Sequence, residues 1–407
     1  MAMEFLTAVT AKEAHRLVAE APVKYRTERV LIDRAVGRVA AEDVVSREAI
    51  PAFPRSLVDG YAVISKDIQG ARETTPAFLK LSGEIRIGEK AHMSVREGNC
   101  VQVSTGSMVP EGADGVVMQE YVRVMAGEIE VTRPVHRGEN VVYEGEDISE
   151  GSIVVPRGRR IGPFDAGAFA AIGSTEIQVF ARPRVALLSS GDEIVPVEGD
   201  VPLGKVRDIN RYTVTALLET VGADVEFAGH ARDSVEDITG RLSAAGGHDL
   251  ILISGGSSKG ERDYITASVL ALDGEVVFHG INVRPGKPSI FGRLFGKPFF
   301  GLPGHPVSCA MVTIRFVLPL VKRMAGEEHL PFATWNAALT VNVPSSYGVE
   351  EYVRVRLEKD GDTYMATPVF AKSSVISSLS GTHGYIVVPE GVEGLEKGEP
   401  VEVRPFG

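Results

Sequence analysis

The chain has 407 residues, of which 44% are hydrophobic and 24% are charged, enough for several buried cores and two to four domains. Its 44 Gly and 23 Pro indicate many turns and short strands rather than a helical bundle. The net charge of -11 excludes the sequence-wide basic field that nucleic acids or anionic membranes attract, so we expect neither as a partner. Two cysteines, Cys100 and Cys309, are too few for a disulfide framework or a Cys-based zinc site. With no apolar stretch near the ~20 residues that span a bilayer, the sequence favours a soluble, cytoplasmic protein.

The first predicted element is an amphipathic helix that begins after Thr10. Thr10 and Glu13 form a capping box, and Ala14, Leu17 and Val18 follow at helical spacing. From about residue 30 to 155 the pattern changes to short apolar runs separated by Gly, Pro and Asp. These runs predict a turn-rich β region.

Alternating strand and helix patterns occupy residues 183–326. Continuous apolar runs at 184–189 and 250–253 predict buried strands. Asn210 is expected to cap one helix, and further helices are expected after Ser234, from about Asp263 and after Pro306. Residues 289–294 and 298–302 are hairpin-like, and short strands return after Pro331. The pattern predicts a central doubly wound α/β domain with a mostly parallel sheet, a β-rich inserted domain and a small all-β C-terminal domain. The predicted boundaries are 1–50 with 140–181 (linker), 51–139 (inserted), 182–328 (α/β) and 329–407 (C-terminal, barrel-like).

Three loops of the α/β block are rich in Gly and Ser: 189–193, 254–260 and 301–308. Small residues let backbone N–H groups approach an anion closely, and hydroxyls add further donors. Any one such loop is more often an ordinary turn. Three loops at one sheet edge favour a site for phosphate or a similar oxyanion.

Cations and carboxylates accompany these loops. Arg284 and Lys287 lie in a proline-stiffened segment, although a basic turn is an equal alternative. Five acids at loop or helix starts suit Mg²⁺ together with ligand phosphates, although each could be only a helix cap. These acids are Asp192, Glu193, Asp208, Asp233 and Asp263.

Two polar turns lie in the β-rich region, around Asp59-Gly60 and Ser104-Thr105-Gly106, where a hairpin turn would be the plain reading. Together with the α/β loops they resemble the molybdopterin molybdenumtransferase family, which includes bacterial MoeA and the gephyrin E domain. The matching motifs are SLVDGYAV (56–63), STGSMVPEGADGVVMQE (104–120), GEDI (145–148), SSGDEI (189–194), VRDIN (206–210), SGGSSKGERDY (254–264), RPGKP (284–288), GLPGHPVS (301–308) and EYVRVRL (351–357).

The resemblance implies a homodimer whose active site is shared between subunits. It also implies that the α/β domain binds adenylylated molybdopterin with Mg²⁺ and exchanges AMP for molybdate. The implied catalytic residues are Asp59, Thr105, Asp147, Glu193, Asp233, Asp263 and Lys287, with Glu193, Asp233 and Asp263 at the metal and Asp59, Thr105 and Asp147 supplied by the partner subunit. The implied substrate-binding residues are Ser190, Gly191, Ser254, Gly255, Gly256, Ser258, Arg284, Pro303, Gly304, His305 and Ser308.

The chain departs from the family pattern at three places. Ser190 replaces the usual Thr and keeps the hydroxyl, whereas His305 replaces the usual Asn, and residues 372–374 read Lys-Ser-Ser where the family loop is often Gly-flanked. Two alternative functions remain open at this level: a non-catalytic scaffold of the gephyrin E type, and a molybdopterin adenylyltransferase. The motifs do not distinguish molybdate from tungstate, which have the same charge and nearly the same shape.

Overall fold

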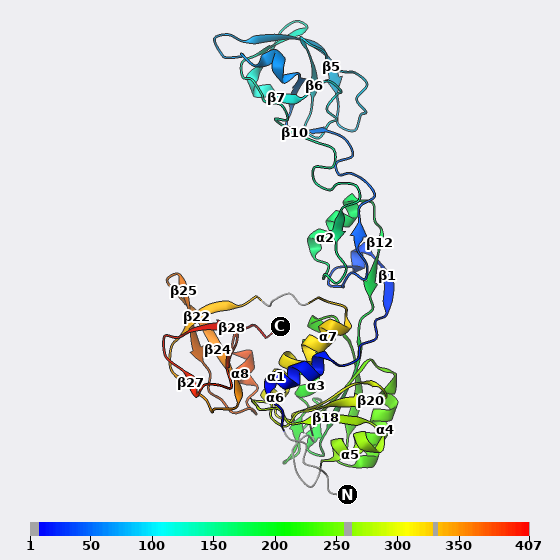
Figure 1. The fold of residues 1–407 in the computed structure, drawn as a ribbon, viewed down its shortest axis with the longest axis vertical. Coiled ribbons are helices and arrows are strands. Elements are labelled where there is room, and N and C mark those ends of the chain that lie inside the picture. The colour runs from blue at the N-terminus through cyan, green and yellow to red at the C-terminus, as the bar shows by residue number, and fades with distance from the viewer. Residues whose placement is uncertain (1–7, 256–262, 329–332, 407) are drawn as a thin grey trace.

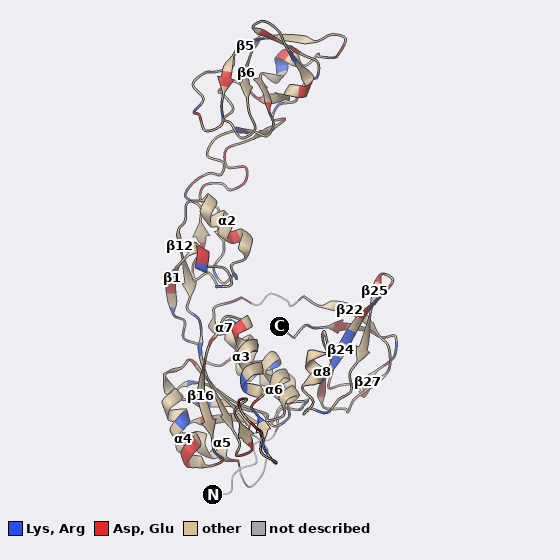
Figure 2. Cartoon of the chain, turned by 180° about the vertical axis from the view of Figure 1, so that it is seen from behind, with Lys and Arg blue, Asp and Glu red and all other residues tan. Residues whose placement is uncertain are grey.

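The computed structural model describes residues 8–255, 263–328 and 333–406 and shows an elongated chain of four regions (Figure 1). The inserted domain lies at one end, and the α/β and C-terminal domains lie side by side at the other. The linker region runs between them. Within the described residues, no helix is both long and apolar enough to cross a membrane. Lys and Arg positions alternate with Asp and Glu positions along the ribbon in all four regions (Figure 2).

The α/β domain is built on a six-stranded sheet whose first four strands are parallel. In spatial order the strands are β16 (Asp224–Ala231), β13 (Arg184–Ser190), β17 (Leu250–Ser254), β21 (Lys297–Leu302), β20 (Ile290–Leu294) and β18 (Glu275–His279). β20 and β21 form the predicted antiparallel hairpin, and β18 pairs antiparallel with β20 at the edge of the sheet. Because β13 is followed by β16 on one side and β17 on the other, the order of the chain reverses at β13.

Helices cover both faces of this sheet, which confirms the predicted doubly wound α/β fold. Each face has its own buried apolar cluster. One face carries α1 (Ala11–Ala19), α3 (Asn210–Thr220), α6 (Pro306–Val312), the π-helix η5 (Thr313–Val317) and α7 (Leu318–Met324). The other face carries α4 (Val235–Ala244), the 3₁₀ turn η4 (Ala245–Gly247) and α5 (Tyr264–Ala271).

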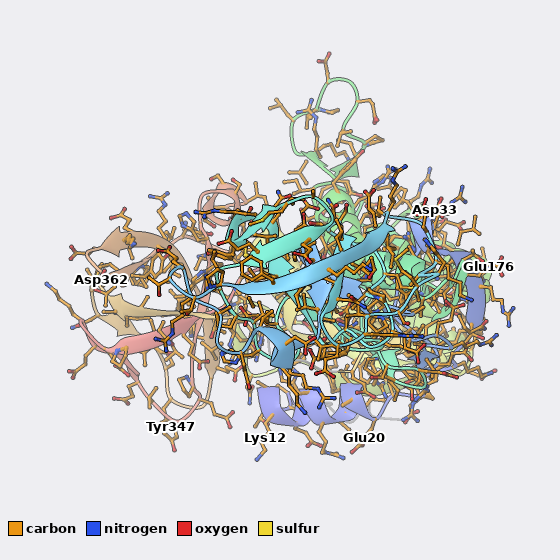
Figure 3. All side chains as sticks on the ribbon, turned by 90° about the horizontal axis from the view of Figure 1, so that it is seen from above. Lys12, Glu20, Asp33, Glu176, Tyr347 and Asp362 are labelled. Atoms are coloured by element: carbon orange, nitrogen blue, oxygen red, sulfur yellow. The ribbon has the colours of Figure 1, made fainter. Side chains whose placement is uncertain are left out.

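Helix α1 begins as predicted, with the Thr10 side chain accepting a hydrogen bond from the Glu13 amide at 3.2 Å. Its apolar face packs into the same buried cluster as α3, α6 and α7. Lys12 and Glu20 point outward from the opposite face (Figure 3). The start of the chain therefore packs with the α/β domain, which differs from the expected grouping of residues 1–50 with the linker.

The C-terminal domain is a curved β structure, as predicted. It also contains one short helix, which the sequence did not predict. It contains β22 (Trp335–Leu339), β23 (Val343–Pro344), β24 (Glu350–Asp360), β25 (Thr363–Pro368), α8 (Ser377–Ser380), β26 (Gly384–Val388), β27 (Gly394–Leu395) and β28 (Pro400–Val403). Strand β19 (Val283–Arg284) of the α/β domain pairs in parallel with β24. This pairing places Arg284 opposite Glu351 and joins the two domains.

Short strands and turns build the other two regions, in agreement with the Gly- and Pro-rich sequence. The linker region contains β1 (Thr27–Leu31), η1 (Ile32–Arg34), β2 (Val44–Val45), β11 (Ile153–Val155), α2 (Pro163–Ala171) and β12 (Glu176–Phe180). The inserted domain contains β3 (Arg55–Ser56), β4 (Gly60–Val63), η2 (Ser65–Ile68), β5 (Ala77–Ile85), β6 (Asn99–Val103), β7 (Gly115–Met118), η3 (Gln119–Tyr121), β8 (Val122–Val124), β9 (Glu128–Val131) and β10 (Val141–Val142), and β10 pairs with β3 where the chain returns to the linker.

Candidate functional site

A cavity of about 1370 Å³ opens at the carboxyl ends of the parallel strands, between the α/β and C-terminal domains. The parallel strands deliver their following loops to this edge, where ligands of open α/β sheets bind. The β14–β15 ribbon (Ile194–Val195 paired with Val206–Arg207) forms one wall, and β24 with residues 369–374 forms the facing wall. Predicted site residues that line the cavity are Ser190, Glu193, Ser254, Gly255, Arg284, Lys287, Pro303, Gly304, His305 and Ser308.

The strand-end loops approach one another so closely that one glycine is obligatory. Gly255 has φ of +106°, and a Cβ there would lie 2.1 Å from the Ser190 carbonyl oxygen. Gly304 lies on the other side, and a Cβ on it would meet the Gly255 Cα at 3.7 Å. Backbone groups of three loops are therefore gathered at one edge, as the Gly and Ser pattern predicts.

Five Lys and Arg side chains line the cavity, Arg207, Arg284, Lys287, Arg354 and Lys372, and of these Arg354 is buried. Arg284 and Lys287 are exposed, and Arg284 lies 3.7 Å from the Glu351 carboxylate. Arg354 of β24 is only 6% exposed; its Nη2 donates to the Ala371 carbonyl at 2.8 Å. No other described residue offers a hydrogen-bond partner to Nε or Nη1 of this guanidinium, and burial lowers the pKa of Arg354. A buried guanidinium with free donors beside a cavity is a binding group for an oxyanion.

Sequence reasoning assigned no role to Arg354, although it lies in the quoted motif EYVRVRL. The available signal was its position two residues after Tyr352, since residues i and i+2 of a strand share one face. Tyr352 is buried, so the same face should be apolar, and a charge placed on it is unusual.

Two of the departures from the family pattern contact each other. The Ser373 hydroxyl lies 3.0 Å from His305 Nδ1, and the Val307 amide donates to the Ser373 carbonyl at 3.0 Å. His305 lines the cavity, as expected, and it also ties the loop before α6 to the C-terminal domain. The substitution at residue 305 and the changed loop at 372–374 are thus one structural feature.

Acidic side chains meet where β13 and β16 end. The Asp233 amide lies 3.4 Å from Asp192 Oδ1, and the Asp192 amide lies 3.5 Å from Asp233 Oδ2. Burial, with the charges of Asp192 and Glu193, raises the pKa of Asp233. Asp233 Oδ1 is buried with no partner in the described part of the chain. A Cβ on Gly191, whose φ is +140°, would lie 2.8 Å from Glu193 Oε2, so Gly191 makes room for this carboxylate.

Asp263 lies apart from this acidic group in the structure. Its carboxylate accepts a hydrogen bond from the Thr266 amide at 3.1 Å, which caps α5, and lies 3.2 Å from His279 Nδ1. Across residues 8–255, 263–328 and 333–406, no three His, Cys, Asp or Glu side chains gather into a metal-sized group. The implied trio of Glu193, Asp233 and Asp263 is therefore not assembled in the chain alone.

The remaining predicted residues fall into two groups. Gly256 and Ser258 fall outside the described residues. Asp59 and Thr105 are exposed on the inserted domain, where Asp59 Oδ1 accepts from the Thr105 amide at 2.8 Å. Asp147 is exposed between the inserted domain and the linker. The inserted domain lies at the far end of the chain from the cavity (Figure 1), so these three residues do not reach the cavity of their own chain.

Family models cover nearly the whole chain. The MoeA N-terminal region (domain I and II) matches residues 9–173, a probable molybdopterin binding domain matches 186–323, and the MoeA C-terminal region (domain IV) matches 336–406. A putative molybdopterin biosynthesis protein of Methanocaldococcus jannaschii is 33% identical, and a molybdopterin molybdenumtransferase of Haemophilus influenzae is 31% identical; each alignment covers 96% of both chains. A solved structure of the molybdopterin biosynthesis moeA protein from Pyrococcus horikoshii has a TM-score of 0.84 at 35% identity, covering 98% of this chain and 100% of that one.

Proposed function

The chain belongs to the MoeA family, and from that premise we propose that it is a molybdopterin molybdenumtransferase of molybdenum cofactor biosynthesis. Its substrates would be molybdate and adenylylated molybdopterin, and AMP would be released. The observation that carries the proposal is the cavity itself, where three anion-binding loops face cations from two domains. Both substrates are anions, which a protein of net charge -11 can attract only at such a local site.

The two walls of the cavity would divide the substrates between them. The loops at Ser190 and Ser254-Gly255 present hydroxyl and amide groups suited to the phosphates of the adenylylated substrate. Lys287 and Arg354 present charges suited to a tetrahedral oxyanion such as molybdate. Leaving the Arg354 charge buried without an anion costs stability, so ligand binding would relieve an existing penalty.

Catalysis would depend mainly on position and charge. The bond to be broken joins the adenylyl phosphorus to the bridging oxygen of the molybdopterin phosphate, and water supplies the hydroxyl that AMP gains. Lys287 and Arg284 would stabilise the negative charge that develops on the phosphate oxygens, and the hydroxyls would orient them. No protein nucleophile is required for such a displacement.

Glu193 and Asp233 would hold the Mg²⁺ that we infer as the cofactor, with Asp192 beside them. The unpartnered Asp233 Oδ1 and the negative charges of Asp192 and Glu193 acting on it fit a cation, and Mg²⁺ needs only one or two protein carboxylates when phosphates supply other ligands. When bound, Mg²⁺ supplies positive charge to the phosphates. Asp233→Asn should raise the half-saturating Mg²⁺ concentration by about tenfold, whereas Asp224→Asn, at the opposite end of β16, should not. An unchanged Mg²⁺ requirement in Asp233→Asn would remove Asp233 from the metal site.

A homodimer would complete the site with Asp59, Thr105 and Asp147 of the partner subunit. Its support is a set of large apolar side chains exposed in the linker region, because such side chains gathered in water mark association surfaces. These residues are Leu31 (50% exposed), Val36 (47%), Val45 (43%), Ile153 (54%) and Phe164 (92%). In this arrangement the inserted domain of each subunit serves the cavity of the other.

The test is AMP release from adenylylated molybdopterin, measured with molybdate or Mg²⁺ omitted in turn. A transferase releases AMP only when all components are present. Lys287→Ala should lower the rate, while Lys359→Ala, at the exposed end of β24, should leave it unchanged. A scaffold would release no AMP, and an adenylyltransferase would instead form adenylylated molybdopterin from ATP and molybdopterin. Either result would overturn the proposal.

A further inference from the structure

The carboxyl ends of the four parallel strands are held together by two side chains from one short segment, Asp208 to Asn210. This segment follows β15 and runs into α3. Asp208 is 3% exposed and Asn210 is 8% exposed, whereas Ile209 between them is 38% exposed. The first and third residues thus face the sheet edge and the middle residue faces away.

Asp208 joins the two strands on one side of the sheet. Its Oδ2 accepts a hydrogen bond from the Ser189 hydroxyl of β13 at 2.6 Å and lies 3.0 Å from Nε2 of His230 on β16. Its Oδ1 accepts from the Arg211 amide at 3.0 Å, which caps α3. Within the described residues this carboxylate thus contacts β13, β16 and the start of α3, and Asp208 also lines the cavity.

Asn210 joins the other two strands. Its Nδ2 donates to the Ser254 hydroxyl at the end of β17, at 2.7 Å, and to the Gly304 carbonyl in the loop after β21, at 2.9 Å. The Gly304 carbonyl can only accept, which fixes the orientation of the amide. Asn210 Oδ1 is buried and has no partner among the residues that the structure describes. The Asn210 side chain therefore contacts the two loops and is largely shielded from solvent.

We propose that Asp208 and Asn210 are positioning residues, which set the spacing of the anion-binding loops before any ligand arrives. Ser254, Gly255 and Gly304 line the cavity and depend on Asn210, while Ser189 and Ser190 depend on Asp208. The same segment is tied to the acidic loop, because the Asp208 amide donates to the Val195 carbonyl at 3.0 Å and, in the preceding strand β15, the Val206 amide donates to the Glu193 carbonyl at 2.9 Å. One segment thus sets the relative positions of the loops that would bind the phosphates, the oxyanion and the metal. The proposal deepens the transferase function and rests on it for its kinetic part.

The first test needs no substrate and uses amide hydrogen exchange in the full chain. Asn210→Ala should accelerate exchange of the amides in residues 253–255 and 304–305, and Asp208→Asn that of the amides in residues 188–190 and 229–231, in each case by about tenfold, the effect expected when one buried hydrogen bond is lost. Asp208→Asn retains one oxygen to cap α3. Ser268→Ala is the matched control, since it removes a buried hydroxyl that donates to the Val235 carbonyl of α4 at 3.3 Å. Exchange no faster than in the control would overturn the positioning role.

The second test separates positioning from simple destabilisation. In steady-state AMP release, misplaced loops should lower kcat on the order of 10- to 100-fold with KM changed by no more than about threefold. Ser268→Ala should leave both constants unchanged. Loosened loops with wild-type kcat would show that the segment serves only the fold. If wild-type protein releases no AMP while the exchange result holds, the proposed function fails and the positioning role stands.

Discussion

A single residue, Arg354, would supply the proposed oxyanion contact of the facing wall. Its backbone lies in β24 among apolar neighbours, and its guanidinium uses Nη2 on the Ala371 carbonyl while Nε and Nη1 find no partner within the described residues. A planar fork of donors suits the oxygens of molybdate, whereas an ammonium group would offer only a point charge. The planar arrangement of the donors, in addition to their charge, should therefore determine the affinity for molybdate.

Arg354→Lys should raise the KM for molybdate by about 10- to 100-fold, the loss expected when hydrogen bonds to a charged group are removed. The melting temperature should stay close to that of the wild type, because Arg354 forms no ion pair with any other residue that the structure describes. Arg356→Lys is the control on the same strand, since Arg356 is exposed and donates to the Gly381 carbonyl. Equal KM values in the two variants would exclude Arg354 from the oxyanion site.

Sequence reasoning identified ten of the residues that line the cavity, but not the contacts by which Asp208 and Asn210 join its loops. Gly255, Lys287 and His305 belong to short, distinctive motifs, so they could be found without a structure. Asn210 was predicted as a helix cap, and this was wrong: the cap oxygen belongs to Asp208, and the Asn210 amide reaches Ser254 and Gly304 instead. A cap and a cross-sheet contact use the same residue type, and only the fold distinguishes them.

At the scale of elements, helix α6 is joined to the C-terminal domain by His305 and Ser373. Both residues line the cavity. Their side chains contact each other, and the neighbouring Val307 amide donates to the Ser373 carbonyl. Replacing either His305 or Ser373 by Ala removes the same hydrogen bond between their two side chains. His305→Ala and Ser373→Ala should weaken binding of adenylylated molybdopterin, and the double variant should be no weaker than the worse single variant.

Calorimetric titration of the four proteins in this cycle gives the coupling energy between the two side chains. A coupling near 1 kcal/mol is the order expected for one hydrogen bond. Strictly additive losses would mean that His305 and Ser373 act independently and that the contact does not join the domains.

Helix α1 contributes a pH-dependent term to stability through His15. The imidazole stacks on Phe316 of η5 at 4.4 Å and lies 3.4 Å from the Arg315 guanidinium. Burial, together with the charges of Arg315 and Arg404, lowers the pKa of His15 from 6.5 to about 4. Between these two pH values the unfolded chain binds a proton at His15 that the folded chain does not bind.

The free energy of unfolding should therefore fall as the pH drops from about 6.5 to about 4, by up to about 3 kcal/mol from this residue. Above pH 6.5 the contribution is fully present. His15→Phe keeps the stacked ring and should remove this part of the pH dependence in urea unfolding. His136→Phe, an exposed site on the inserted domain, should not. The same slope in wild type and His15→Phe would show that His15 does not cause the acid sensitivity.

The order and type of elements in the α/β domain could be predicted because its strands are continuous apolar runs with clear breaks. The position of α1 could not, because an amphipathic helix shows that it packs but not against which domain. The long helical stretch after Pro306 contains a π-helical turn at Thr313–Val317, which places Arg315 near Glu350 of the C-terminal domain at 3.5 Å. No local sequence pattern predicts such a turn, because it depends on the contacts made across the domain boundary.

At the scale of the whole molecule, the elongated shape keeps Asp59 far from its own cavity, which motivates the proposed two-subunit site (Figure 1). If each site uses two subunits, Asp59→Asn and Lys287→Ala chains should complement each other. Half of a random mixture would be heterodimers, each with one intact site and one doubly altered site. Co-expression should therefore restore about a quarter of wild-type AMP release. Activity no higher than that of either parent would place both residues in one chain's site.

The central claim is that this cavity exchanges AMP for molybdenum on one molecule of cofactor. The most direct measurement determines, in a single turnover, the AMP released and the molybdenum retained on the pterin by purified wild-type protein. The account predicts one molybdenum for each AMP, with both products lost together in Arg354→Lys at limiting molybdate. AMP release that proceeds equally well without molybdate, or molybdenum uptake without AMP release, would contradict it.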